Sequence, residues 1–288
     1  MKGIILAGGS GTRLFPATLG VCKQLLPVYD KPMVYYPLTT LMLSGIRDIL
    51  IVSTPRDTPL LSQFIGNGTQ WGLSLSYAVQ DTPRGIADAF RVGRDFIGKD
   101  DVALILGDNI FISNELQTIL HAAVSKRTGA RLFACRVSDP ERFGVVEIDK
   151  DSRVISLEEK PKKPKSRWAV TGLYFYDNSV VEAARELTPS ARGELEITTL
   201  NASYLSRNSL HVEQFGRAVI WIDTGTHESL LEASVLVRTL QKRHNQMIGS
   251  PEEVAFRLGY IGKEQLAATA SKYSNSEYSY YLQQILDE

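Results

Sequence analysis

The chain has 288 residues, of which 43% are hydrophobic and 22% charged, so it is long enough to bury a large core. Lys plus Arg number 32, as do Asp plus Glu, and the formal net charge is zero. Because a nucleic-acid binder usually carries a basic excess or a basic face, this balance argues against nucleic acid as a partner. The two cysteines, Cys22 and Cys135, are too few for a disulfide framework, and the apolar N-terminal run is too short for a signal peptide or a membrane span. We therefore expect a cytoplasmic protein without a membrane partner.

Short apolar runs alternate with longer amphipathic runs through the first half of the chain. This alternation predicts an α/β fold with a Rossmann-like, largely parallel sheet flanked by helices. Strands are expected at Gly3–Ala7, Asp48–Ser53, Leu73–Val79, Val102–Leu106 and Arg131–Val137. The helices expected between them are Pro32–Ser44, Gly85–Phe96 and Ser113–Lys126.

From about residue 138 the apolar runs lie closer together, which predicts a smaller antiparallel part and then a helical C-terminus. Strands are expected at Gly144–Ile148, Arg153–Glu158, Ala169–Tyr176 and Ala218–Ile222. Helices are expected at Glu194–Ser206, at His227–Asn245 and in the tail from Pro251. No flexible linker interrupts the chain. We expect one domain over residues 1–288 in three parts, at about 1–137, 138–225 and 226–288.

A glycine-rich loop follows the first predicted strand and contains Gly8, Gly9, Ser10, Gly11, Thr12 and Arg13. Glycines let backbone N–H groups approach an anion closely, and the loop lies where open α/β sheets bind ligands. A dinucleotide fingerprint is excluded because Leu14 stands at the third glycine position, and no Walker A sequence is present. A plain tight turn is the alternative. Two cations, Arg13 and then Lys23, favour a loop that binds phosphate.

Two aspartates, Asp108 and Asp223, each follow one of the predicted apolar strands. An acid at the carboxyl end of a buried strand projects into the ligand crevice, which is a usual place for a magnesium ligand. Each also has a structural alternative. Asp108 could start a turn with Asn109, and Asp223 could cap the helix that begins near His227.

These residues belong to a series of segments that resembles the sugar-phosphate nucleotidyltransferase family. The segments are Gly8–Leu14 with Pro16, Thr18, Lys23 and Leu26–Pro27, and then Asp30–Met33, Leu106–Asn109, Glu158–Pro161, Gly193–Thr198 and Trp221–Thr226. The resemblance spans nearly the whole chain. It implies a magnesium-dependent transfer of a deoxythymidylyl group from dTTP to glucose 1-phosphate, which yields dTDP-glucose and pyrophosphate for deoxysugar and surface-polysaccharide synthesis. It also implies a homotetramer.

The resemblance assigns nucleotide binding to the first part of the chain. The glycine-rich loop, Arg13 and Lys23 would bind the triphosphate, and Asp108 and Asp223 would hold Mg²⁺. Gln80 and Gly85 would hold the base with Gln24 nearby. A solvated loop glutamine is the alternative for Gln80. The family commonly has an aspartate before the glycine, whereas Arg84 precedes Gly85 here.

Sugar binding falls to the second part of the chain. Lys160 offers a compact cation for the sugar phosphate, and Glu159 can accept hydrogen bonds from sugar hydroxyls. Arg192 is a further candidate for phosphate, with support of a helix start as its alternative. The basic run 160–167 is interpreted as a solvated loop in which Lys160 alone belongs to the site. The substrate-binding residues expected are Asn109, Gly144, Glu159, Lys160, Val170 and Arg192.

Three rival functions remain open. They are the same chemistry with UTP, CTP or another sugar, a catalytically silent regulatory paralogue, and a dinucleotide-dependent oxidoreductase, which the failed glycine fingerprint opposes. The joint presence of the catalytic candidates argues against a silent paralogue. These candidates are Arg13, Lys23, Asp108 and Lys160, together with Asp223.

Family members often carry a second nucleotide site, to which Tyr, Gly and His after Phe111 contribute. Ile112, Ser113 and Asn114 occupy these positions here, which predicts weak feedback by dTDP-sugars.

Overall fold

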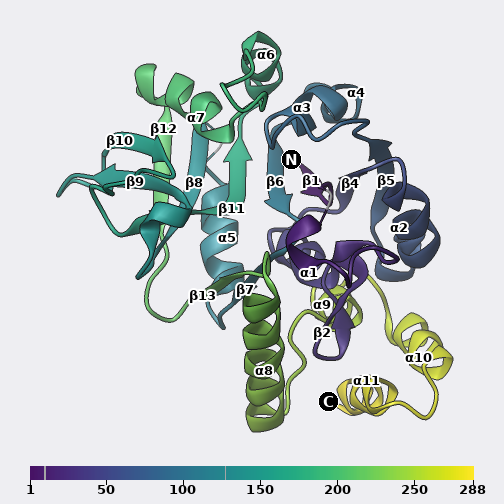
Figure 1. Cartoon of the computed structure of the whole chain (residues 1–288). Helices are drawn as coiled ribbons and strands as arrows, with labels where there is room; N and C mark the ends of the chain where they lie inside the picture. The colour runs from purple at the N-terminus through teal and green to yellow at the C-terminus, as the bar shows by residue number, and fades with distance from the viewer. Residues whose placement is uncertain (10, 127) are drawn as a thin grey trace.

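A computed structural model describes residues 1–9, 11–126 and 128–288. Within these residues, nine strands form one mixed sheet. Figure 1 shows this sheet between layers of helices, with the C-terminal helices gathered at the lower right. The strands are β1 Lys2–Leu6, β4 Asp48–Ser53, β5 Ser74–Val79, β6 Val102–Leu106, β8 Ala130–Arg136, β9 Gly144–Ile148, β10 Val154–Glu159, β11 Trp168–Tyr176 and β12 Leu210–Gln214.

The helices include all those expected from the sequence, together with α2 and α6, which were not predicted. Their bounds are α1 Tyr35–Leu43, α2 Asp57–Ile65, α3 Asp88–Val92, α4 Arg94–Ile97, α5 Leu116–Val124, α6 Val180–Glu186, α7 Ile197–Ser206, α8 His227–His244, α9 Pro251–Arg257, α10 Lys263–Lys272 and α11 Glu277–Asp287. The single helix expected at Gly85–Phe96 is therefore wrong in detail. It begins only at Asp88 and is divided at Gly93, which ends α3 and precedes α4.

Four neighbouring strands, β5, β4, β1 and β6, run parallel, which confirms the expected largely parallel sheet. β11 lies antiparallel to β6, and β8 and β12 continue the sheet beyond β11. One edge of β11 pairs with β8, whereas its other edge pairs with β9 through Trp168 and Ala169 and with β6 from Leu173 to Tyr176. β11 thus joins the smaller antiparallel strands to the main sheet. The division of the chain into three functional parts stays a prediction.

Both faces of the sheet are buried, as its apolar strands require. Successive strand residues alternate between two clusters, with Ile4 and Leu104 in one and Ile5 and Ile105 in the other. Helices α3, α6 and α7 cover the first cluster, and α1 and α5 cover the second. The carboxyl ends of β1, β5 and β6 therefore lie at an edge of the sheet that helices hold in place from both faces.

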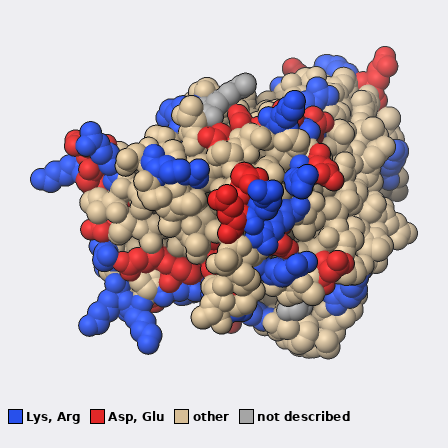
Figure 2. All heavy atoms as spheres, turned by 90° about the horizontal axis from the view of Figure 1, so that it is seen from above, with Lys and Arg blue, Asp and Glu red and all other residues tan. Residues whose placement is uncertain are grey.

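In the described part of the chain, two short sheets lie outside the main one. β2, Pro27–Val28, pairs with β3, Lys31–Pro32, in a hairpin that packs against α8. β7, Asn109–Ile112, pairs antiparallel with β13, Ile220–Asp223. None of the helices in the described ranges is long and apolar enough to cross a membrane. On the face drawn in Figure 2, acidic and basic side chains are interspersed and do not form a single basic patch.

Candidate active site

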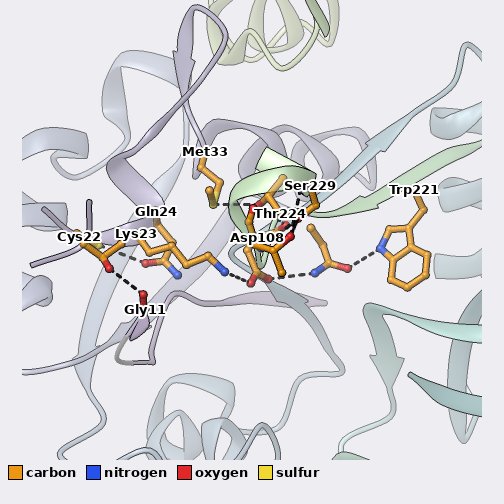
Figure 3. A network of polar contacts seen from close by, with 12 residues as sticks. Gly11, Cys22, Lys23, Gln24, Met33, Asp108, Trp221, Thr224 and Ser229 are labelled. Carbon is orange, nitrogen blue, oxygen red and sulfur yellow. Dashed lines mark hydrogen bonds and ion pairs between the residues drawn. The ribbon is translucent and has the colours of Figure 1, made fainter. Parts of the chain in front are cut away.

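The pairing of β7 with β13 brings the two predicted metal aspartates to one corner of the molecule. Asp108 lies in the turn between β6 and β7, and Asp223 ends β13 opposite Asn109. The hydroxyl and the backbone N–H of Thr224 both donate to the backbone carbonyl of Asp108, at 2.7 and 3.0 Å. Figure 3 shows Asp108 and Thr224 side by side within a polar network. The turn proposed for Asp108 is present, and the aspartate lies beside Asp223 as well.

Helix α8 does not use Asp223 as its cap. Its N-cap is Thr226, whose side chain accepts from the backbone N–H of Ser229, while the Ser229 hydroxyl accepts from the N–H of Thr226. This reciprocal capping box satisfies the first turn of the helix. The capping alternative for Asp223 is therefore excluded, and its carboxylate is left to the corner beside Asp108.

Lys23 is the cation closest to the two aspartates. It begins a short 3-10 helix, Lys23–Leu25, and its ammonium group forms an ion pair with Oδ2 of Asp108. In Figure 3 the Lys23 side chain reaches across to Asp108 from the N-terminal segment. The Lys23 side chain is only 12% exposed. The positive charge is thus held in place before any substrate arrives.

The two carboxylates influence each other electrically. Burial and the negative charge of Asp108 raise the pKa of Asp223 from 3.8 to about 6, although Lys23 and Arg13 act in the opposite direction. Two neighbouring carboxylates repel each other when both are charged, and a cation between them stabilises the charged pair. Lys23 supplies part of this stabilisation.

The acid pair fits a magnesium ion better than a structural transition metal. Mg²⁺ is usually held by one or two carboxylates together with water and substrate phosphate oxygens. Over residues 1–9, 11–126 and 128–288, no three His, Cys, Asp or Glu side chains are grouped as a metal cluster would need. The donor set of Asp108 and Asp223 therefore suits an ion that arrives with a phosphorylated substrate.

Asn109 is committed mainly to the protein. It is 1% exposed, and its Oδ1 accepts from Trp221 Nε1 at 2.6 Å and from the backbone N–H of Gly172 at 3.0 Å. Its Nδ2 donates to Oδ1 of Asp108 at 3.1 Å. Asn109 thus orients the Asp108 carboxylate and links it to β11. A direct contact of Asn109 with substrate stays a prediction.

A cavity of about 490 Å³ opens next to this corner, between β11, β10 and β13. Most of the predicted sugar-site residues share its wall. Among its lining residues are Arg13, Asn109, Gly144, Glu159, Lys160, Val170 and Asp223. Sequence reasoning did not single out Tyr174, Thr198, Asn201 or Trp221, which also line the cavity. Thr198 and Trp221 lie in segments that carry the family resemblance, whereas Tyr174 and Asn201 had no distinguishing signal.

Glu159 and Lys160 form a small polar centre in this cavity. The Thr198 hydroxyl donates to Oε2 of Glu159, and the Lys160 ammonium lies 3.7 Å from Oε1. Lys160 has a φ of 44°, a left-handed conformation that costs a non-glycine residue energy and that clusters at functional sites. Its backbone N–H donates to the carbonyl of Phe143 at 3.0 Å, which holds the turn.

Arg192 is surrounded by acids. Its guanidinium contacts Oε2 of Glu196 at 2.8 Å and lies 3.7 Å from Glu159 and 3.8 Å from Glu194. This arrangement supports the start of α7, because Glu196 is the residue that precedes the helix. Arg192 also lines the cavity beside the glycine-rich loop, where these acids surround its guanidinium group.

A second cavity, of about 220 Å³, lies beside the glycine-rich loop. Gly8, Gly9, Gln80 and Gly85 line it. It shares Ile86, Glu159, Lys160 and Ile197 with the larger cavity. The predicted nucleotide residues and the predicted sugar residues thus meet at Lys160.

Backbone conformation explains two of these glycines. Gly9 has a φ of 107°, a backbone conformation that residues other than glycine rarely adopt. Gly85 has a φ of 100°, and a β-carbon there would lie 2.6 Å from the carbonyl oxygen of Leu195. A side chain at position 85 would therefore strain the backbone or displace Leu195 in this part of the structure.

Some predicted nucleotide residues do not line either cavity. Gln24 is 3% exposed, and its Oε1 accepts from the thiol of Cys22 at 3.3 Å. Gly11 and Thr12 lie in the loop but outside the lining of both cavities. Ser10 lies outside the described residues. Lys23 and Asp108 are also absent from the lining of both cavities. Direct nucleotide contacts stay predictions for all the residues named as nucleotide-binding.

The two cysteines play no visible part in the chemistry. Both are buried and free, and burial raises the pKa of Cys22 to about 11 and that of Cys135 to about 12. A thiol is a nucleophile only as its thiolate. Direct attack by substrate is therefore the simpler route at this site.

Residues 2–239 match the model of the nucleotidyl transferase family. This chain belongs to that family. Glucose-1-phosphate thymidylyltransferase of Neisseria meningitidis is 54% identical over 286 residues, which cover 99% of each chain. The enzyme of the same name from Mycolicibacterium smegmatis is 55% identical over 287 residues, which cover 100% of this chain and 99% of the relative.

Solved structures of the family share the fold. A putative glucose-1-phosphate thymidylyltransferase from Bacillus anthracis, in complex with sucrose, superposes with a TM-score of 0.77 at 44% identity, over 83% of this chain and 95% of that one. A UDP-glucose pyrophosphorylase in complex with UDP-glucose gives a TM-score of 0.73 at 25% identity, over 83% of this chain and 98% of that one. The fold class expected from the sequence is confirmed, and the chain is a nucleotidyltransferase.

Proposed function

We propose that this nucleotidyltransferase converts dTTP and glucose 1-phosphate into dTDP-glucose and pyrophosphate. The observation that carries the proposal is the meeting of two cavities at Lys160, with Asp223 in the wall of the larger cavity and the Lys23–Asp108 ion pair beside Asp223. The names of relatives at 53–55% identity over nearly the full chain support the substrate pair.

In the proposed reaction, a phosphate oxygen of glucose 1-phosphate attacks the α-phosphorus of dTTP. A new P–O bond forms there, and the bond from the α-phosphorus to the oxygen that bridges to the β-phosphate breaks. Pyrophosphate leaves with that electron pair. Such a transfer depends on positioning and on neutralisation of phosphate charge more than on a covalent catalyst.

Named residues would supply these effects. Lys160, at the junction of the cavities, would bind the sugar phosphate, and Glu159 would accept from sugar hydroxyls. Arg13 and Lys23 would neutralise charge as pyrophosphate departs, which requires Lys23 to exchange Asp108 for phosphate. The glycine-rich loop would present backbone N–H groups to the triphosphate. Gln80 and Gly85, on the wall of the smaller cavity, would hold the base.

Members of the family generally use a divalent cation, and we propose Mg²⁺ for this chain. Asp108 and Asp223 would hold it, and when bound it would act as a Lewis acid on the α-phosphate. Asn109 and Thr224 keep Asp108 in the orientation that binding needs. The cytoplasm is the proposed compartment, and a homotetramer, by family resemblance, the proposed assembly. Neither nucleic acid nor membrane is a proposed partner.

UTP is the second candidate nucleotide, because a UDP-glucose pyrophosphorylase shares the fold at a TM-score of 0.73. Pyrophosphate release across a matrix of nucleotides and sugar 1-phosphates separates the candidates. We expect the highest kcat/KM for dTTP with glucose 1-phosphate. A clear preference for UTP would replace the substrate assignment, and no release with any pair would indicate the silent paralogue.

A further inference from the structure

The side-chain amide of Gln80 has a fixed orientation in the wall of the smaller cavity. Gln80 is 5% exposed, and its Nε2 donates to Oδ2 of Asp88 at 2.9 Å. The same nitrogen lies 3.4 Å from the carbonyl oxygen of Gly85, to which it also donates. Both N–H groups of the amide are therefore directed at the protein.

Asp88 determines which end of the amide faces it. Asp88 is 2% exposed and lies in the first turn of α3. A carboxylate has acceptor oxygens only, so it must meet the NH₂ end of Gln80 and not the carbonyl end. An amide held in the opposite orientation would bring two acceptors together in a buried place, which is costly.

The carbonyl end of Gln80 points toward the glycine-rich loop. A β-carbon on Gly8 would lie 3.2 Å from Oε1 of Gln80, so this oxygen approaches the loop where Gly8 lines the cavity. The backbone N–H of Gln80 donates to the carbonyl of Ser53 at 2.7 Å, which fixes the residue at the end of β5. The smaller cavity is therefore offered a hydrogen-bond acceptor at this point.

Arg84, which departs from the family pattern, contributes less than Asp88 to the orientation of the Gln80 amide. Its Nε lies 3.8 Å from Oδ2 of Asp88, and its side chain is 58% exposed. Ion pairs with so exposed a partner are weak. Its backbone matters more, because the carbonyl of Arg84 accepts from the N–H of Leu195 at 2.6 Å and holds the loop against the segment before α7.

We propose that Asp88 is a positioning residue for base selection, which rests on the proposed function because it requires the base to lie in the smaller cavity. Through Gln80, Asp88 presents an acceptor to the pyrimidine edge. Thymine and uracil carry an N3–H donor that this oxygen can accept, whereas N3 of cytosine is itself an acceptor. The arrangement selects nucleotides with an N3–H and discriminates against cytidine nucleotides.

The test compares dUTP with dCTP, because neither base has the methyl group of thymine. For the unaltered enzyme with glucose 1-phosphate, we expect kcat/KM for dUTP to exceed that for dCTP by about tenfold to hundredfold, the range of one buried hydrogen bond. In Asp88→Asn the new amide can face Gln80 with either end, so Gln80 can turn. The ratio should fall by about tenfold, while the KM for glucose 1-phosphate stays the same.

Two variants serve as controls. Asp81→Asn changes an exposed aspartate in the same loop and should leave the ratio unchanged, and Asp88→Glu keeps an acceptor-only group and should retain most of the discrimination. If Asp88→Asn does not fold, Asp88→Ser replaces it, because a hydroxyl can also either donate or accept.

An unchanged dUTP to dCTP ratio in a folded Asp88→Asn or Asp88→Ser enzyme would overturn the proposal, as would a ratio near one in the unaltered enzyme. Either result is compatible with normal turnover of dTTP, so the proposed function would still stand. Failure of the proposed function looks different, because pyrophosphate would then be released with none of dTTP, dUTP and dCTP.

Discussion

Thr224 fastens the end of β13 to the turn after β6 through the backbone carbonyl of Asp108, which accepts from both its hydroxyl at 2.7 Å and its N–H at 3.0 Å. Because Thr224 follows Asp223 directly, these two hydrogen bonds fix the two aspartates relative to each other. Contacts of Thr224 with the turn after β6 therefore set the relative position of the two aspartates.

We predict that Thr224→Val lowers kcat by a few-fold to about tenfold and raises the magnesium concentration needed for half-maximal rate. The variant keeps the shape of the side chain but loses one buried hydrogen bond, worth about 0.5–1.5 kcal/mol. Steady-state rates over a magnesium titration measure both effects. Thr239→Val, which removes a hydroxyl on α8 that donates to the carbonyl of Val235, is the matched control and should change neither value. Equal behaviour of the two variants would contradict the role of Thr224.

We predict that Asp108→Asn and Asp223→Asn each reduce turnover by orders of magnitude while the chain stays folded. The loss removes carboxylate ligation of a Lewis acid that is worth several kcal/mol to the transition state, and each 1.36 kcal/mol is tenfold in rate. Circular dichroism and thermal unfolding check the fold. Asp95→Asn, at a fully exposed aspartate, should retain full turnover. Near-normal turnover of a folded Asp223→Asn enzyme would remove that residue from the metal site.

We predict that Lys160→Ala weakens the use of glucose 1-phosphate more than that of dTTP. A charge-assisted contact contributes about 1.5–3 kcal/mol, which corresponds to roughly tenfold to hundredfold in affinity. Isothermal titration with each substrate separates the two effects. Lys163→Ala changes an exposed lysine of the same basic run and should have no effect. Equal losses for both substrates would indicate a general structural defect instead of a sugar-phosphate contact.

We predict that Gly85→Ala destabilises the chain more than Gly259→Ala and also raises the KM for dTTP. Both glycines have positive φ, at 100° and 70°, but only at Gly85 would a β-carbon meet a neighbouring backbone, at 2.6 Å from Leu195. The difference in unfolding free energy should be about 1–3 kcal/mol, as for other overpacked sites. Denaturant unfolding measures it. Equal destabilisation would mean that the loop moves freely away from Leu195.

We predict weak feedback inhibition by dTDP-sugars. Ile112, Ser113 and Asn114 line a cavity of about 360 Å³ between α1 and α9, away from the proposed chemistry. An aromatic at this place could contribute about 1–3 kcal/mol by stacking on a base, and the chain has none at these three positions. Inhibition by dTDP-rhamnose at saturating concentrations of both substrates tests this. Potent non-competitive inhibition would show that neighbouring residues compensate.

The sequence predicted best those elements whose residues are determined by burial alone. Val102–Leu106 and Gly144–Ile148 have the expected bounds, because continuous or alternating apolar residues require a covered sheet. β12, Leu210–Gln214, was not predicted, because only two of its five residues are apolar and its place in the sheet depends on pairing with β8. Local patterns contain no information about such a partner.

Chemistry and motif together singled out Asp108, Asp223 and Lys160, and the structure places Asp223 and Lys160 in the wall of the larger cavity. The roles of these residues stay predictions. A side chain that acts through a neighbour could not be predicted in this way. Asp88 lies within an expected helix and gave no signal, since its contact with Gln80 depends on the packing of α3 against the end of β5. Gln24 gave a motif signal, yet the structure leaves its side chain only 3% exposed, with its Oε1 bonded to the thiol of Cys22.

The rate of pyrophosphate release from dTTP and glucose 1-phosphate, with and without Mg²⁺, is the decisive measurement for the proposed reaction. Our expectation is that release requires both substrates and the metal ion, and that one dTDP-glucose forms for each pyrophosphate. Release that continues when glucose 1-phosphate is omitted, or that is unaffected when Mg²⁺ is removed with EDTA, would contradict it.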